Sequence, residues 1–329
     1  RHDGQTLDTD VVERLCRRTE GWAAGLVLAG LSLQHAADPA RFAESFHGDD
    51  QLVVDYMTDE FLAAEGDEQR RRLLETSVLE QFNGSLVDAV TDSRGGASWL
   101  AATATTNQLL IGLDRTGSWY RYHHLFRDLL RLEAEQTLPP EHLEELHRRA
   151  AAWFEADGDP LRAIGHRLAA GQHAAAVRLM YVLGPQLISD GHIDTLRGVL
   201  EGIGEPAAND PACALAWGWC EYIGGNYNAA ERWVNTTHRV AGPGFDPVIT
   251  APLRMNLAVA HGDVGVALGL ARGMRATDQL STHRPELATS AGGVFMWAGQ
   301  ADEARAVLEV AVARSAATDF RASQVLSRI

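Results

Sequence analysis

The chain has 329 residues, of which 46% are hydrophobic, and it carries a net charge of −15. This hydrophobic share excludes a disordered chain, and the length predicts two or three domains. The negative charge argues against direct contact with nucleic acid, because phosphate backbones are bound by clustered positive charge. All 29 basic residues are arginines. A phosphate-binding loop of the G-x-x-x-x-G-K-[ST] type needs a lysine and is therefore excluded from these residues.

Cysteine usage indicates a reducing compartment. The three cysteines, Cys16, Cys213 and Cys220, form no C-x-x-C pair. Cys213 and Cys220 are seven residues apart and so share one helix face, where a buried thiol acts as a small hydrophobic group rather than a metal ligand. No apolar run reaches the roughly 18 residues of a membrane span. We therefore expect a cytoplasmic protein with no metal and no membrane partner.

The first 66 residues are predicted to be helical. Apolar residues repeat at helical spacing over residues 7–34, where Asp8 or Asp10 can cap the first turn, although Gly21 and Gly25 interrupt the pattern. Two further helices are predicted over residues 39–46 and 52–64. The chain lacks an initiator Met, and we expect both of its ends to continue in a longer protein.

Residues 67–137 have the pattern of a winged-helix domain. Helices are predicted over residues 68–77, 85–90, 97–107 and 124–136. Before the last of these, the apolar run 109–113 and residues 119–122 flank a turn at 114–117, which predicts a β-hairpin with Gly117 at positive φ. The helix before the hairpin contains no arginine, and Arg94 is its only basic neighbour. Because phosphate contacts are then missing, we expect a structural rather than a DNA-binding winged helix.

From residue 138 onward the sequence predicts repeated helical hairpins. Glycines that can end a helix recur 33 to 37 residues apart, at Gly158, Gly191, Gly225, Gly262 and Gly299. Each is followed by a helix rich in small residues, which lets neighbouring helices pack closely. A period near 34 residues is typical of tetratricopeptide repeats, which stack into a solenoid. Residues 138–329 are therefore predicted to form a tetratricopeptide-like α-solenoid.

Three stretches together resemble one family. They are TEGWAAGL at residues 19–26, WYRYHHLFRDLL at residues 119–130 and LHRRAAAWF at residues 146–154. In this order they are similar to MalT-like regulators of the LuxR family, which are large ATP-binding proteins of the signal-transduction ATPase class. The resemblance covers about residues 7–181, and beyond them only the helical repeat supports it.

The resemblance implies a mainly α fold with three parts. These are a helical lid at the end of an ATPase module (residues 1–66), a winged-helix domain (67–137) and a solenoid that senses an effector (138–329). It also implies an ATPase core and a C-terminal helix-turn-helix outside this sequence. ATP or ADP with Mg would bind the longer protein but not these residues alone. A small-molecule or protein effector would bind the solenoid, the active state would self-associate, and DNA would be contacted only through the helix-turn-helix.

His123 and His124 are the leading site candidates. They lie where the hairpin meets the next helix, and the unpaired N–H groups of a helix start attract phosphate. Related winged-helix switch domains carry a Met-His-Asp signature here, whose His contacts the β-phosphate of ADP. The resemblance gives that role to His123, whereas His124 stands in place of the Asp. The alternative is that His123 is a capping or core residue.

Two further sets of residues are weaker candidates. Gly21 and Trp22 resemble the Gly-Leu-Pro segment that packs against adenine in related proteins, although Ala23 replaces the Pro; Trp22 is equally well a core residue. Aromatic residues in the repeats form a possible effector platform. They are Trp217, Trp219, Tyr222, Tyr227 and Trp233. Aromatic residues at helical spacing more often fill the core between helices.

Three functions remain open at this stage. The first is a nucleotide-switched transcriptional regulator, the second is a protein-interaction scaffold, and the third is a chimeric regulator with a cyclase or kinase as its output. The sequence has no G-x-S-x-G or H-E-x-x-H motif. We therefore expect no enzymatic activity from this chain by itself, because nothing in it holds a γ-phosphate with Mg²⁺.

Overall fold

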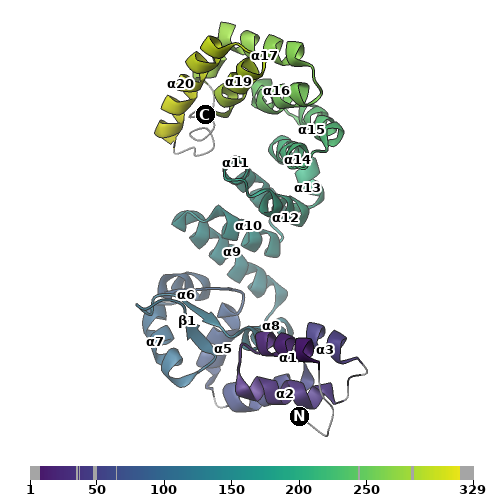
Figure 1. Cartoon of the computed structure of the whole chain (residues 1–329). Coiled ribbons are helices and arrows are strands. Elements are labelled where there is room, and N and C mark those ends of the chain that lie inside the picture. The colour runs from purple at the N-terminus through teal and green to yellow at the C-terminus, as the bar shows by residue number, and fades with distance from the viewer. Residues whose placement is uncertain are drawn as a thin grey trace. The chain divides into compact units, whose positions relative to one another are not determined.

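The computed structural model describes residues 8–34, 36, 38–46, 50–63, 65–243, 245–282 and 285–318. The chain is mainly α-helical, as the sequence predicts, and it forms two compact units, residues 1–158 and 159–329 (Figure 1). None of the described helices is long and apolar enough to cross a membrane. The boundaries predicted at residues 66 and 137 both lie inside the first unit, and they stay predictions.

The first unit begins with a group of short helices. They are α1 (Thr9–Arg18), α2 (Ala23–Leu33), α3 (Pro39–Ser45), α4 (Gln51–Met57) and the π-helical turn η1 (Thr58–Leu62). The single helix predicted over residues 7–34 is wrong, because the chain reverses between α1 and α2. Glu20 and Gly21 both have positive φ, 47° and 75°, which ends a right-handed helix.

The winged-helix pattern is confirmed. Its elements are α5 (Asp67–Thr76), α6 (Gly84–Thr91), α7 (Gly96–Thr106), β1 (Leu110–Gly112), β2 (Tyr120–Tyr122) and α8 (His124–Thr137), followed by α9 (Pro140–Asp157). The two strands pair antiparallel, with Leu110 opposite Tyr122. Gly117 has φ 63° in the hairpin turn, as predicted. Glycine also permits α6 and α7 to touch, because a Cβ on Gly96 would lie 2.4 Å from the carbonyl oxygen of Gly84.

An aromatic core joins the short helices to the winged helix. The Phe61 ring of η1 lies 6.2 Å from that of Phe126 in α8, and Tyr122 packs against Phe126 at 5.7 Å. The Tyr122 hydroxyl also shares a 2.6 Å hydrogen bond with Thr76, so its only polar atom is satisfied. Burying each such ring contributes about 1.5–3 kcal/mol. This core fixes the position of β2 and of the first turn of α8, where the candidate histidines lie.

The second unit consists of helices that follow one another in hairpins (Figure 1). They are α10 (Pro160–Ala169), α11 (His173–Ser189), α12 (Ile193–Ile203), α13 (Glu205–Ala208), α14 (Pro211–Ile223), α15 (Tyr227–Val240), η2 (Pro247–Thr250), α16 (Ala251–Ala260), α17 (Val264–Ala276), α18 (Gln279–Thr282), α19 (Pro285–Trp297) and α20 (Ala301–Thr318). Every glycine predicted to end a helix has φ between 73° and 83°, which confirms the repeat period.

Cys213 and Cys220 are buried on α14, in the core shared by α11, α12 and α14. The prediction that both are core residues is confirmed. Burial raises the pKa of the Cys220 thiol to about 11, because the thiolate would lose its solvation. These thiols therefore stay protonated at neutral pH and pack as small apolar groups.

Candidate functional site

The candidate site lies inside the first unit, where the loop between α1 and α2 meets the start of α8. Strand β2 presents Arg121, and the backbone N–H of His123 donates to the Leu109 carbonyl at 2.6 Å, which extends the hairpin pairing by one residue. His123 is then the N-cap of α8 and His124 is its first residue. The hairpin thus sets three polar side chains, Arg121, His123 and His124, against Glu20.

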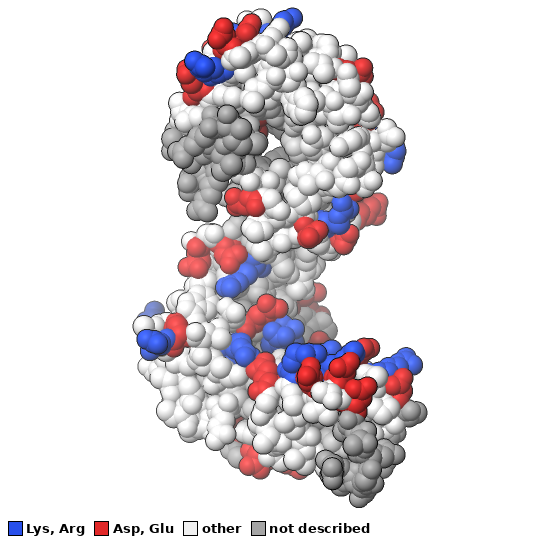
Figure 2. Space-filling model, viewed as in Figure 1, with Lys and Arg blue, Asp and Glu red and all other residues white. Residues whose placement is uncertain are grey.

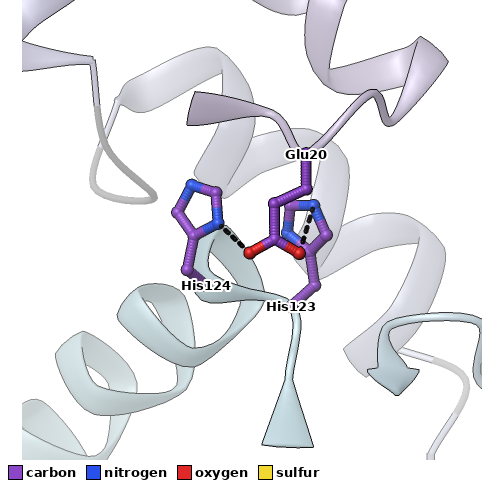
Figure 3. A group of neighbouring side chains, drawn as sticks. All are labelled: Glu20, His123 and His124. Carbon is purple, nitrogen blue, oxygen red and sulfur yellow. Dashed lines mark hydrogen bonds and ion pairs between the residues drawn. The ribbon is translucent and has the colours of Figure 1, made fainter. Parts of the chain in front are cut away.

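Glu20 is the centre of this group, which we call the Glu20 cluster: Glu20, Arg121, His123 and His124. The Arg121 guanidinium donates to both Glu20 carboxylate oxygens, at 3.0 and 2.9 Å. Nδ1 of His124 donates to Oε1 of Glu20 at 2.9 Å, and Nε2 of His123 lies 4.0 Å from Oε2 (Figure 3). One carboxylate therefore receives three hydrogen bonds from the strand-to-helix junction, about 100 residues away in the sequence.

Glu20 is ionised at any physiological pH. Partial burial by itself raises the pKa of Glu20, but the hydrogen bonds from Arg121 and His124 and the nearby positive charge outweigh it and lower that pKa to about 2. The Glu20 carboxylate is therefore a permanent anion that accepts hydrogen bonds from Arg121 and His124. Paired donors of this kind bind carboxylate and phosphate groups alike.

His123 lies behind this carboxylate and is 5% exposed. Its Nε2–H donates to the Thr19 carbonyl at 2.9 Å, and its ring packs 4.9 Å from that of His124 and 5.9 Å from that of Trp22. Burial lowers the pKa of His123, so the ring is neutral and its other nitrogen, Nδ1, carries no proton. Nδ1 is buried and has no hydrogen-bond partner among the described residues. The proposed β-phosphate contact of His123 stays a prediction, and the geometry here is that of a core residue.

His124 differs from His123 in facing a pocket. Its side chain is 24% exposed, but its Nε2 is itself buried and has no hydrogen-bond partner among the described residues. In Figure 3 that nitrogen points away from Glu20. The pocket, of about 380 Å³, we call the arginine pocket. Its lining residues are Arg14, Arg17, Arg18, Ala43, Glu44 and His124.

The arginine pocket carries more positive than negative charge. Arg14 is ion-paired with Glu44, whose backbone carbonyl accepts from Arg18 at 2.7 Å. Arg17 lies 4.0 Å from Glu13, and its side chain is 71% exposed. Figure 2 shows the resulting mixture of basic and acidic side chains over α1 and α3. Since three guanidinium groups line the pocket against one carboxylate, it suits an anion better than a cation.

Glu20, His123 and His124 also place possible metal-ligand atoms within 4.8 Å of one another. A metal ion would have to share the Glu20 carboxylate with Arg121, which already donates to both oxygens. The donor set therefore fits an oxyanion site and not a zinc or magnesium site.

Gly21 and Trp22 lie beside the Glu20 cluster. Trp22 is the N-cap of α2, and its ring contacts those of Tyr56 at 5.9 Å and Phe61 at 6.4 Å. A Cβ on Gly25 would lie 2.4 Å from the Trp22 ring, so glycine at position 25 makes room for the indole. Trp22 therefore packs the start of α2 against α4, η1 and His123; its predicted contact with adenine stays a prediction.

The five aromatic residues proposed as an effector platform divide into two groups. Trp217 and Trp233 stack at 5.8 Å with an interplanar angle of 13°, and the Arg197 guanidinium lies 5.5 Å from the Trp217 ring. Trp219, Tyr222 and Tyr227 form a separate chain of contacts at 5.8 and 5.6 Å. Trp217, Trp219 and Tyr222 pack against the buried clusters of the repeats. Most of this aromatic surface is thus used for helix packing, and its effector role stays a prediction.

Sequence reasoning did not identify Glu20, Arg121 or the arginines of α1. Glu20 and Arg121 are parts of the two stretches that carry the family resemblance, but nothing local indicates that they meet. The usable signal was the run Arg17-Arg18-Thr19-Glu20 at a helix end, followed by Gly21. It marks a chain reversal rich in charge, which is where a tertiary ion pair is expected.

Comparison with known proteins places the winged helix in a family. Residues 58–152 match the MalT winged helix domain. The chain is 36% identical over 167 residues to the HTH-type transcriptional regulator MalT of Klebsiella pneumoniae, covering 50% of this chain and 18% of that protein. It is 31% identical over 198 residues to the serine/threonine-protein kinase PknK of Mycobacterium tuberculosis, covering 60% of this chain and 18% of that protein. The chain thus spans about a fifth of the length of these relatives.

One solved structure has a similar fold over most of the chain. It is a Signal Transduction ATPase with Numerous Domains (STAND) protein with a tetratricopeptide repeat sensor from Pyrococcus horikoshii. The TM-score is 0.55 at 12% sequence identity, and the match covers 91% of this chain and 55% of that one. At this identity the likeness concerns the fold alone, and it agrees with the predicted solenoid.

Proposed function

From the premise that this chain is MalT-like and carries a MalT winged helix domain, we propose that it serves as the phosphate-sensing lid and the effector-sensing solenoid of a nucleotide-switched regulator. In the proposed longer protein it is joined to a nucleotide-binding core that supplies the phosphate loop and holds Mg²⁺ with ATP or ADP. We expect no ATP hydrolysis by the chain itself, because it has no lysine for such a loop.

The observation that carries this proposal is the arginine pocket, where three guanidinium groups and the His124 ring, whose buried Nε2 has no partner among the described residues, line one cavity. A phosphate in that pocket would meet the guanidinium groups of Arg14, Arg17 and Arg18. Nε2 of His124 would donate to it only in the ring form that carries a proton on both nitrogens, because Nδ1–H already donates to Glu20. The N-terminal end of α8, a helix of 14 residues, adds a positive dipole at the same place. We assign the phosphate contact to His124 and a positioning role to His123, whose Nε2 is already bound to Thr19.

The solenoid would carry the signal. We propose that an effector binds the repeats, that the regulator then self-associates in the cytoplasm, and that its output is transcription through a helix-turn-helix outside this chain. The MalT relatives, named HTH-type transcriptional regulators, support this output. The PknK relative supports a second candidate, in which the same lid and solenoid control a protein kinase. A basic helix-turn-helix or a kinase domain elsewhere in the longer protein would distinguish the two.

The test is ADP binding to the longer protein, measured by calorimetry. His124→Ala is expected to weaken binding by about 1.5–3 kcal/mol, roughly 10- to 100-fold, since it removes a hydrogen bond to a charged group. His173→Ala is the matched control, because His173 is exposed at the start of α11 in the other unit. Equal ADP affinity of the wild type and His124→Ala would refute the assignment. Equal loss in His123→Ala and His124→Ala would show that the two rings act together.

A further inference from the structure

We propose that Arg121 and His124 form an oxyanion-binding site, which the Glu20 carboxylate occupies in the absence of ligand. A phosphoryl group of a nucleotide binds the same donors by displacing that carboxylate. This inference rests on the proposed function and deepens it, because it names the protein's own carboxylate that competes with a phosphoryl group for the Arg121 and His124 donors. It also adds Arg121 to the residues that contact the ligand.

The first support is the geometry around the carboxylate. Arg121 donates through two nitrogens, one to each Glu20 oxygen. His124 adds a third donor to Oε1 (Figure 3). A phosphoryl group presents tetrahedral oxygens with a similar spacing and up to twice the charge, so the same donors can hold it. The carboxylate therefore marks the position that a phosphoryl group would take.

The second support is that the Glu20 side chain can leave without unfolding its surroundings. It is 29% exposed, whereas His123 behind it is 5% exposed. The backbone N–H groups of Glu20 and Gly21 bond to Arg17 and Cys16 at the end of α1, so the loop is held without the carboxylate. Rotation about the side-chain bonds of Glu20 is then sufficient to expose the Arg121 and His124 donors.

The third support is continuity with the arginine pocket. His124 belongs to both, since its Nδ1 bonds to Glu20 and its ring lines the pocket with Arg14, Arg17 and Arg18. A ligand with more than one phosphoryl group could therefore occupy the pocket and reach the Arg121 donors past His124. A single weak anion would bind with less favourable free energy. It would have to displace the ionised Glu20 carboxylate and would gain only the contacts with Arg121 and His124.

The consequence is a coupling between ligand and lid. Glu20 and Arg121 join the loop after α1 to β2, and a phosphoryl group that takes Arg121 removes that ion pair. Ligand binding thus removes the direct ion pair between the loop after α1 and β2. In its place, the ligand contacts Arg121. The remaining connections, from Thr19 to His123 and through Trp22, would persist.

The experiment is calorimetric titration of pyrophosphate into the 329-residue chain at low salt. Glu20→Gln keeps the size of the side chain but removes its charge, and it is expected to raise pyrophosphate affinity about tenfold. Glu13→Gln is the matched control, because Glu13 is an exposed carboxylate on the same helix α1 and makes only a 4.0 Å pair with Arg17. It changes the net charge equally and should alter affinity less than about twofold.

Arg121→Gln completes the design. It should bind pyrophosphate about tenfold more weakly than the wild type, and the double variant with Glu20→Gln should bind as weakly as Arg121→Gln alone. Thermal unfolding followed by circular dichroism confirms that each variant is folded. If Glu20→Gln does not fold, Glu20→Asp replaces it; its shorter side chain cannot reach both Arg121 nitrogens, so an intermediate gain in affinity is expected.

Three results would overturn the inference. Equal gains in Glu20→Gln and Glu13→Gln would mean that only net charge matters. Weaker binding by Glu20→Gln would mean that the carboxylate supports the site instead of competing for it. No pyrophosphate binding by any variant would mean that Arg121 and His124 form no oxyanion site. In each case the ADP titration of the longer protein still decides the proposed function separately, because that test depends on His124 and not on Glu20.

Discussion

The two candidate sites of this protein, the Glu20 cluster in the first unit and the aromatic residues of the repeats in the second, are built in opposite ways. In the Glu20 cluster, residues about 100 positions apart surround a carboxylate, and Nδ1 of His123 and Nε2 of His124 have no partner among the described residues. In the repeats, the rings of Trp217 and Trp233 stack on each other, and Trp217 also contacts Arg197. Unsatisfied polar groups beside a pocket indicate a ligand, whereas satisfied aromatic faces indicate packing.

The largest expected effect tests whether the aromatic residues of the repeats serve helix packing. Trp217→Ala should lower the free energy of unfolding of the second unit by about 2–4 kcal/mol, because it removes a large partly buried ring and leaves a cavity between helices. Urea denaturation followed by circular dichroism measures the loss, with Trp297→Ala as the control, since Trp297 is 76% exposed. Unchanged stability of Trp217→Ala would return this residue to the candidates for effector binding.

The next effect tests how the first unit responds to acid. Burial, with a smaller contribution from Arg131, lowers the pKa of His147 in α9 to about 4. The unfolded chain takes up this proton near pH 6.5 and the folded chain only near pH 4, so stability is complete above pH 6.5 and falls between these values. The loss should approach about 2–3 kcal/mol at pH 4. Unfolding measured from pH 7 to pH 4 should show it, and His147→Gln should remove this part of the dependence.

The smallest effect concerns Glu20. Its pKa is lowered to about 2, so its contribution to stability is present above the unfolded value of 4.5 and is lost as the pH falls toward 2. Because the carboxylate is partly exposed, solvent screening reduces this contribution to about 1 kcal/mol. Glu20→Gln should lose about that amount at pH 7 in thermal or urea unfolding. A loss above 3 kcal/mol would mean that Glu20 is mainly structural and would weaken its assignment as a displaceable group.

The spacing of apolar residues and the positions of glycines along the sequence were sufficient to predict most helices and strands of both units. Helical periodicity and the Gly117 turn predicted the winged helix, and the glycine period predicted the helix ends of the repeats. The single helix over residues 7–34 was wrong for a definable reason. Hydrophobic spacing continues from α1 into α2, but Glu20 adopts positive φ, which a non-glycine residue seldom does and which hydrophobic spacing does not indicate.

The candidate site was predicted only in part, for the same kind of reason. His123 and His124 were found because they adjoin a predicted strand-to-helix junction. Their different roles were not predictable, since adjacent residues at a helix start point in different directions, and only packing determines which one is buried. The aromatic residues were found by composition, and composition alone does not say whether a ring face is already covered.

The sequence by itself determined the helical class, the winged helix, the repeat period and the absence of a lysine-dependent phosphate loop, because these follow from periodicity, turn chemistry and residue type. Only the tertiary structure decided that Glu20 meets Arg121 and His124, that His123 is buried against Thr19, and that α1 turns its arginines toward His124. The physical reason is that ion pairs and buried hydrogen bonds depend on which surfaces the hydrophobic core brings together. That choice is made by packing over long sequence distances.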